Sequence, residues 1–204
     1  SGRRGVSFPF LLRRPGWCDE PEVTVNGEKF PVNQDEDVME ITRVWKDGDV
    51  VVLRLPMKVA VSRWHENSAA VERGPLVYAL ALTEHWEKKS LSGDEAVQFG
   101  PEYYEVTSDD RWNYGLVETI VKNPSLCIVE TDESKAAESF FWNMEGAPVK
   151  IRVMAKEHPF WEKYGPDAGP LPLSFRLSPY PEEEIELIPY GCTTLRISEF
   201  PIVR

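Results

Sequence analysis

Proline and glycine interrupt this sequence too often for long helices. The 204 residues include 17 prolines and 13 glycines, and both residue types end helices and mark turns. The apolar segments between them are short and rich in β-branched and aromatic residues, as in Val50–Met57 and Leu76–Leu82. Such runs are typical of strands. The sequence therefore predicts an all-β fold.

Two turns organise the first half of the chain. Asn26-Gly27 separates the alternating segment Glu22–Val25 from a second one that begins at Glu28. Asn-Gly is a strong hairpin signal because both residues tolerate a positive φ. Arg73-Gly74-Pro75 is expected to be a fixed bend between two further strands. The short strands and frequent turns predict two antiparallel, jelly-roll-like β-sandwich units.

A polar segment with little periodicity, His85–Gly100, divides the chain. We therefore expect a first sandwich at residues 6–83 and a second one at residues 84–204. Residues 1–5 do not suggest a secretory signal, because no apolar run of the kind that such a signal needs follows the arginine pair; they are expected to be a cloning scar or a disordered lead. The native N-terminus is expected to lie upstream, so the sequence predicts no localisation.

The charge balance disfavours several classes of partner. Lys and Arg number 23 against 34 Asp and Glu, a net charge of −11, which argues against binding to the phosphate backbone of a nucleic acid. No apolar run reaches the roughly 18 residues that suggest a membrane-spanning helix. Cys18, Cys127 and Cys192 lie far apart, so they predict neither a disulfide framework nor a paired zinc motif.

Seven short motifs occur in a recognisable order along the chain. They are Leu12–Trp17, Val25–Gly27, Ile41–Asp49, Leu53–Met57, Glu72–Leu80, Leu187–Cys192 and Leu195–Pro201. Together they resemble the C-terminal β-sandwich region of glycoside hydrolase family 127, formerly domain of unknown function 1680. The resemblance extends from Val6 to Pro201. It implies a parent enzyme of the β-L-arabinofuranosidase type, in which a helical (α/α)6 barrel precedes the sandwiches.

The resemblance implies that the chemistry lies outside this chain. In the family a cysteine thiolate in the barrel is the proposed nucleophile, and a glutamate and cysteines hold zinc. Cys18, Cys127 and Cys192 match no part of that pattern, so we expect no catalytic residue, no metal ligand and no cofactor here. The strands that precede Leu12 in the family are also absent, which implies an incomplete first sandwich with an exposed edge.

The carboxylates suggest no catalytic pair. A glycosidase needs two carboxyl groups about 5–10 Å apart across the sugar. The most prominent acidic groups are Asp109-Asp110, Asp132-Glu133 and Glu182–Glu184. Adjacent acids on a strand point to opposite faces of the sheet, so none of these groups is favoured as such a pair.

Aromatic side chains suggest one binding role. Seven tryptophans are present, and Trp112, Tyr114 and Trp161 combine aromatic rings with loops and polar neighbours. Binding sites of small molecules pair apolar and aromatic walls with a few polar groups, and a sugar offers an apolar C–H face to such a ring. These three residues are therefore the candidate saccharide-binding residues, although tryptophan also packs readily into a core.

Three functions are compatible with the sequence. The first is a non-catalytic accessory fragment of a glycoside hydrolase, inactive by itself, whose role is structural or in dimerisation. Its partners would be the upstream helical barrel and a second copy of the protein. The second is a carbohydrate-binding module that holds a plant-type saccharide on exposed Trp or Tyr side chains. The third is an autonomous hydrolase, which would require a carboxylate pair or metal cluster.

Overall fold

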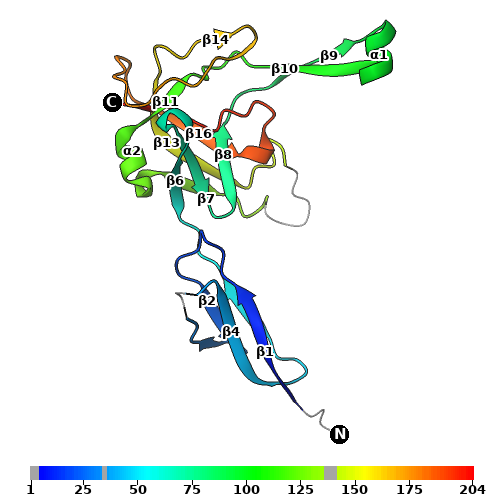
Figure 1. Ribbon diagram of the computed structural model, residues 1–204, viewed down its shortest axis with the longest axis vertical. Helices are drawn as coiled ribbons and strands as arrows, with labels where there is room; N and C mark the ends of the chain where they lie inside the picture. Colours follow the sequence, from blue (N-terminus) through cyan, green and yellow to red (C-terminus); the bar gives the residue numbers. More distant parts are fainter. Residues whose placement is uncertain (1–4, 34–35, 136–141) are drawn as a thin grey trace. The chain divides into compact units, whose positions relative to one another are not determined.

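The structure is mostly β, as the sequence predicts. The computed structural model describes residues 5–33, 36–135 and 142–204, and these form seventeen strands and two short α-helices (Figure 1). The expected lead of residues 1–5 lies outside the described residues except for Gly5. Within the described ranges, no helix is long and apolar enough to cross a membrane. The chain folds as two units, residues 1–58 with 73–75 and residues 59–72 with 76–204.

The first unit contains two small sheets around one core. One sheet pairs β1 (Val6–Arg13) with β4 (Val38–Trp45), and the other has the order β3 (Glu28–Phe30), β2 (Glu22–Val25) and β5 (Val51–Arg54). Alternate residues of β2 and β4 form the core, namely Val23, Val25, Met39 and Ile41, all at most 5% exposed. Side chains from the remaining strands pack against this core. That the first sandwich is incomplete stays a prediction.

The hairpin between β2 and β3 confirms the turn predicted from the sequence. Asn26 and Gly27 have φ values of 54° and 83°, the left-handed region that Asn and Gly tolerate best. The Asn26 side chain also links this turn to the one between β4 and β5. Its Nδ2 donates to Asp49 Oδ1 at 2.9 Å, and its Oδ1 accepts from the Val50 N–H at 2.8 Å. Gly74, in the predicted bend, is left-handed too, with a φ of 60°.

The second unit is built on one curled, mixed sheet. Its strands are, in spatial order, β17 (Ile202–Val203), β11 (Tyr114–Val117), β13 (Val149–Glu157), β16 (Glu183–Pro189), β8 (Leu76–Leu80), β7 (Ala69–Arg73) and β6 (Val59–Arg63), and β12 (Ile128–Thr131) also pairs with β13. The strands β11 and β17 run parallel, with Leu116 opposite Ile202. The prediction of purely antiparallel sheets is therefore corrected here, because alternation along a strand does not encode the direction of a distant partner.

One apolar core covers this sheet. Its largest fully buried side chains are Tyr78, Leu116, Ile151, Leu187, Phe200 and Ile202, all 0% exposed. The short helix α2 (Glu118–Lys122) adds Ile120 to the core. Single turns of 3-10 helix lie at His65–Asn67, Pro124–Leu126 and Tyr190–Cys192.

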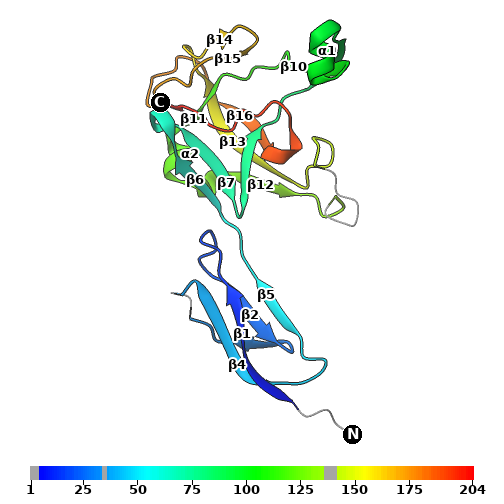
Figure 2. The ribbon, with the colours of Figure 1, turned by 45° about the vertical axis from the view of Figure 1, so that its right-hand side comes forward.

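A hairpin with a helix at its tip extends from the second unit. It consists of β9 (His85–Ser90), α1 (Gly93–Phe99) and β10 (Glu102–Thr107) (Figures 1 and 2).

The sequence places a domain boundary between residues 83 and 84, whereas the units divide near residue 58. The reason is that β6, β7 and β8 belong to the same sheet as β16. The two-residue strands β14 (Lys163–Tyr164) and β15 (Asp167–Ala168) form a separate small hairpin.

Candidate functional site

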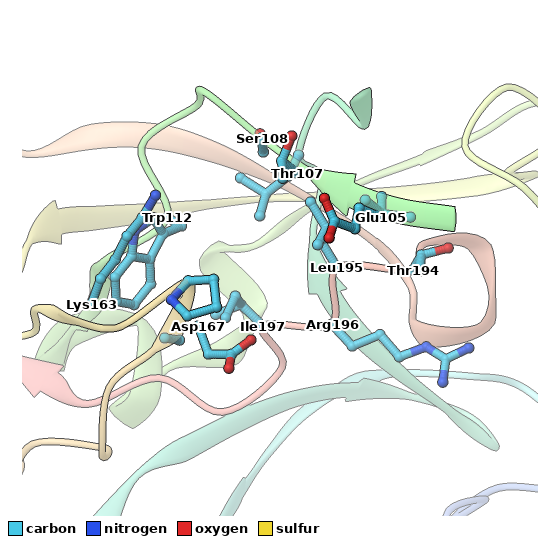
Figure 3. Close-up of a pocket in the computed structure, with 14 residues that line it drawn as sticks. Glu105, Thr107, Ser108, Trp112, Lys163, Asp167, Thr194, Leu195, Arg196 and Ile197 are labelled. Carbon is cyan, nitrogen blue, oxygen red and sulfur yellow. The ribbon is translucent and has the colours of Figure 1, made fainter. Parts of the chain in front are cut away.

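A pocket of about 540 Å³ opens on the second unit (Figure 3). It is lined by the end of β10, the loop that follows β10, the β14–β15 hairpin and the segment 194–197. Figure 3 shows the Trp112 ring on one side of the pocket and Glu105 on the other. The lining combines one large aromatic ring with apolar, hydroxyl and charged side chains, and this size and mixture are typical of small-molecule sites.

The three aromatic residues predicted from the sequence have different positions. Trp112 is half-buried and lines the pocket. Trp161 is 4% exposed and packs edge-on against Trp112, with ring centroids 5.1 Å apart, while its Nε1 donates to the Gly169 carbonyl at 3.0 Å. Tyr114, on β11, is 8% exposed, and burial raises the pKa of its hydroxyl. Trp112 is thus the one of the three whose ring lines the pocket, and Trp161 supports it.

Glu84 organises one wall of the pocket, although nothing in the sequence singled it out. Its Oε1 accepts hydrogen bonds from Thr193 Oγ1 at 2.8 Å, from the Thr194 N–H at 2.5 Å and from the Leu195 N–H at 3.4 Å. Its Oε2 accepts a hydrogen bond from Trp86 Nε1 at 3.0 Å. Burial raises the pKa of this carboxyl, but the hydrogen bonds outweigh burial and the pKa is lowered. The ionised carboxylate therefore holds the turn that supplies Thr194 and Leu195 to the pocket.

His158 anchors the loop that carries β14 and β15. The side chain is fully buried, and its backbone exchanges hydrogen bonds with Asn113, from the His158 N–H to the Asn113 carbonyl at 2.7 Å and from Asn113 Nδ2 to the His158 carbonyl at 3.2 Å. Burial lowers the pKa of the imidazole, and the nearby charge of Arg176 lowers it further. His158 is therefore neutral at pH 7 and acts as a structural support beside Trp112.

The charged groups of the pocket form no catalytic arrangement that can be assigned. Glu105 accepts a hydrogen bond from the Tyr103 hydroxyl at 3.2 Å and pairs with Lys89 at 3.4 Å. Arg196 stacks on the ring of Tyr190, 4.8 Å from its centroid. These contacts involve residues outside the pocket lining. The chemistry that the lining supports is binding through one aromatic face and several polar groups.

The described residues do not fit the zinc that the family resemblance implies for the parent. In the described part of the chain, no three His, Cys, Asp or Glu side chains are grouped so that they could hold a metal ion. Cys18, Cys127 and Cys192 are buried free thiols. Burial raises the pKa of Cys127 to about 11, so this thiol stays protonated at neutral pH.

Comparisons with known proteins connect this fold to a family. Residues 2–57 match the middle domain of the glycoside hydrolase family 127 β-L-arabinofuranosidases. Over 98% of the chain, the structure is similar to that of a family 127 β-L-arabinofuranosidase from Geobacillus stearothermophilus, with 24% sequence identity and a TM-score of 0.55. It is also similar to a glycoside hydrolase, with 24% identity over 97% of the chain and a TM-score of 0.55, and to the β-arabinofuranosidase BT3674, with 18% identity over 98% and a TM-score of 0.53. A search of curated proteins finds no significant match.

The matches concern a part of much longer proteins. The chain spans 27%, 28% and 28% of the length of these three solved chains, respectively. The chain has the β-rich fold of a region found in these solved glycoside hydrolases. The match at residues 2–57 to the middle domain of glycoside hydrolase family 127 agrees with the resemblance that the sequence motifs indicate.

Proposed function

We propose that this chain is a non-catalytic, structural part of a longer family 127 enzyme whose activity is that of a β-L-arabinofuranosidase. The observation that carries this proposal is the agreement between the match to the middle domain at residues 2–57 and the first unit at residues 1–58. A segment that matches a family's accessory domain and also packs around its own core is suited to support other domains. In this role the chain buttresses the helical barrel or a dimer of the parent.

Three of the acids considered in the sequence analysis, Asp110, Glu183 and Glu184, make structural contacts, which supports this proposal. Asp110 Oδ2 accepts from the Thr83 N–H at 2.6 Å, and this hydrogen bond lowers the pKa of Asp110. Glu183 pairs with Arg111 at 2.8 Å, and Glu184 with Arg152 at 2.9 Å. A general acid needs a raised pKa, and a nucleophile needs access to the substrate. The contact of Asp110 lowers its pKa, and the contacts of all three carboxyl groups tie them to partners within the chain.

Hydrolysis of an aryl β-L-arabinofuranoside tests the proposed function. We expect the purified chain to release no more aryl alcohol than the buffer does, while the longer parent protein turns the substrate over. Turnover by the chain, abolished by a single substitution within it, would establish an autonomous hydrolase and contradict the proposal. The parent protein serves as the positive control for the assay.

Saccharide binding in the Trp112 pocket is a second candidate function. The observation that favours it is the pocket of about 540 Å³ with the Trp112 ring in its lining. The edge-on contact of Trp161 with Trp112 holds that ring in one orientation. In this candidate Trp112 carries the sugar, and Trp161 and Tyr114 support the site from the buried side.

A substitution of Trp112 separates the two candidates. If the pocket binds arabinose-containing oligosaccharides, Trp112→Ala is expected to weaken binding about tenfold or more, equivalent to ~1.4 kcal/mol, in isothermal titration calorimetry. Phe160→Ala is the matched control, because Phe160 is a 71% exposed aromatic residue next to the anchor His158 and does not line the pocket. If saturating saccharide produces neither heat nor a rise in melting temperature, the second candidate is wrong.

A further inference from the structure

The chain has one Asn-Gly pair, Asn26-Gly27, at the turn between β2 and β3. An asparagine followed by glycine loses its side-chain amide more readily than one followed by a larger residue, because glycine has no side chain to hinder attack by its backbone nitrogen. Both residues are exposed, and no described atom beyond the adjacent residues lies within 4 Å of the position that a Cβ on Gly27 would take. Burial therefore does not keep water from this pair.

Hydrogen bonds hold the Asn26 side chain instead. Its Nδ2 donates to Asp49 Oδ1 at 2.9 Å, and its Oδ1 accepts from the Val50 N–H at 2.8 Å. We call these two hydrogen bonds the Asn26 clamp. Attack by the Gly27 nitrogen would make the amide carbon tetrahedral and move Oδ1 and Nδ2 out of their common plane. Because the clamp fixes both atoms, the reaction requires that the clamp open first.

Asp49 is held in place as the charged half of the clamp. Its Oδ2 accepts from the Lys46 N–H at 2.9 Å and lies 3.5 Å from the Arg43 guanidinium, and its side chain is 12% exposed. The hydrogen bond from Asn26, followed by the one from Lys46, lowers the pKa of the Asp49 carboxyl. The carboxylate is therefore ionised at neutral pH, and a hydrogen bond to an ionised acceptor is stronger than one to a neutral acceptor.

We infer that Asn26 is a deamidation site that the folded first unit keeps latent. The amide reacts only in molecules in which the Asn26 clamp has opened, and the product prevents the clamp from forming again. Modification therefore accumulates with the time that this part of the first unit spends open. This property concerns the chemical lifetime of the first unit and is independent of the activity proposed for the parent.

The reaction consumes only water. The Gly27 backbone nitrogen attacks Asn26 Cγ and forms a C–N bond, while the Cγ–Nδ2 bond breaks. Nδ2 leaves as ammonia and takes the proton of the Gly27 N–H, so that a five-membered succinimide ring remains. Water then adds to either carbonyl of this ring. Hydrolysis leaves an aspartate at position 26 or an isoaspartate, in which the backbone runs through the former side chain.

Both products oppose the clamp. Nδ2 is a donor 2.9 Å from Asp49 Oδ1, and a carboxylate oxygen in its place has no proton to donate and brings a second negative charge. Two carboxylates that share one site cannot both ionise without cost. An isoaspartate also lengthens the backbone of the turn, at which Val25 pairs with Glu28. Because Val25 also pairs with Val51 of β5, the damage reaches the strand that carries the core of the first unit.

Peptide mapping by mass spectrometry, after incubation in mildly alkaline buffer, tests the protection. We expect Asn26 to deamidate at least about tenfold more slowly in the folded chain than in the same chain in urea, because only open molecules react. Asp49→Ala removes the acceptor of the clamp and is expected to raise the rate in the folded chain about threefold or more. Asp37→Ala is the matched control, because Asp37 is an 85% exposed carboxylate of the first unit that pairs with Arg14.

Asp49→Asn provides a second variant if Asp49→Ala does not fold, which circular dichroism reports. It keeps an acceptor oxygen without the charge, so its rate of deamidation is expected to lie between those of the folded parent and the parent in urea. Equal rates for the folded and the unfolded parent would overturn the inference. So would an equal response of the rate to Asp49→Ala and Asp37→Ala.

Asn26→Asp tests the effect of the product, because it introduces the same charge. It is expected to lower the melting temperature by about 4 °C or more in the parent, but by less than about 2 °C in combination with Asp49→Asn, which removes the repulsion. If Asn26→Asp lowers the melting temperature equally in both backgrounds, repulsion by Asp49 does not keep the clamp open. The part of the inference that concerns the product would then be wrong.

Discussion

Replacing Phe200 with alanine is expected to lower the free energy of unfolding by about 3–5 kcal/mol. The Phe200 side chain is 0% exposed and lies in the core of the second unit. Its backbone is fixed on both sides by Ala69, because the Phe200 N–H donates to the Ala69 carbonyl at 2.9 Å and the Ala69 N–H donates to the Phe200 carbonyl at 2.8 Å. The neighbouring segments therefore cannot collapse freely into the space that the ring leaves. Urea denaturation followed by circular dichroism measures the effect.

Phe99→Ala provides the matched control for Phe200→Ala. Phe99 is 69% exposed at the end of α1, so the same change of side chain is expected to alter the free energy of unfolding by no more than about 0.5 kcal/mol. If the two variants unfold at the same urea concentration, the C-terminal segment contributes less to the core than the structure indicates.

Glu84→Ala is expected to destabilise the chain by about 2–3 kcal/mol, the second-largest effect. The Glu84 carboxylate accepts hydrogen bonds from Thr193, Thr194, Leu195 and Trp86. Hydrogen bonds to a charged group contribute more than neutral ones, and donors left without a partner add a further cost. The turn at residues 193–195 should loosen, and the pocket should lose one wall. Thermal unfolding and the accessibility of the pocket to a fluorescent probe measure these two consequences.

The stability that Glu84 contributes should depend on pH. Its pKa in the folded chain is lowered from an ordinary value of 4.5, since the hydrogen bonds outweigh the burial that raises it. Because the unfolded chain binds the proton more tightly, the contribution is present above about pH 4.5 and is lost as the pH falls through the folded pKa. The difference in unfolding free energy between the wild type and Glu84→Gln should therefore shrink below that pH.

Glu87→Gln is the control for this pH dependence. Glu87 directly follows Trp86 on β9, and its carboxylate is 71% exposed and pairs with Lys89. An exposed ion pair of this kind contributes little to stability. Glu87→Gln should therefore leave the dependence of the unfolding free energy on acidic pH unchanged. If the difference in unfolding free energy between the wild type and Glu84→Gln stays constant as the pH falls below 4.5, the ionised carboxylate of Glu84 does not hold the turn.

Local sequence determined the features that depend on a few neighbouring residues. The abundance of Pro and Gly predicted short strands, and Asn26-Gly27 predicted the left-handed turn between β2 and β3. Ordered motifs pointed to a resemblance to glycoside hydrolase family 127, and the match to the middle domain of that family confirms this resemblance for residues 2–57. These predictions succeed because turn geometry and strand propensity arise from backbone preferences within a few residues.

The candidate site was only partly predictable. The sequence indicated Trp112, Tyr114 and Trp161 together, but the structure buries Tyr114 and Trp161 and leaves Trp112 to line the pocket. Glu84 looked like one acid among many, and its role appears only when the turn at residues 193–195 folds against it. Burial and convergent hydrogen bonds arise between distant segments, so composition and spacing do not reveal them.

By itself, then, the sequence determined a β-rich chain with short strands and tight turns and a resemblance to family 127. Only the tertiary structure decided where the units divide, that β17 runs parallel to β11, and that Ser174 bonds to the carbonyls of Glu66 and Asn67. The physical reason is that these features depend on contacts across long stretches of chain, such as the hydrogen bond from Ser174 to Asn67. Strand direction, burial and stored strain are properties of the packed chain, and no local pattern of residues encodes them.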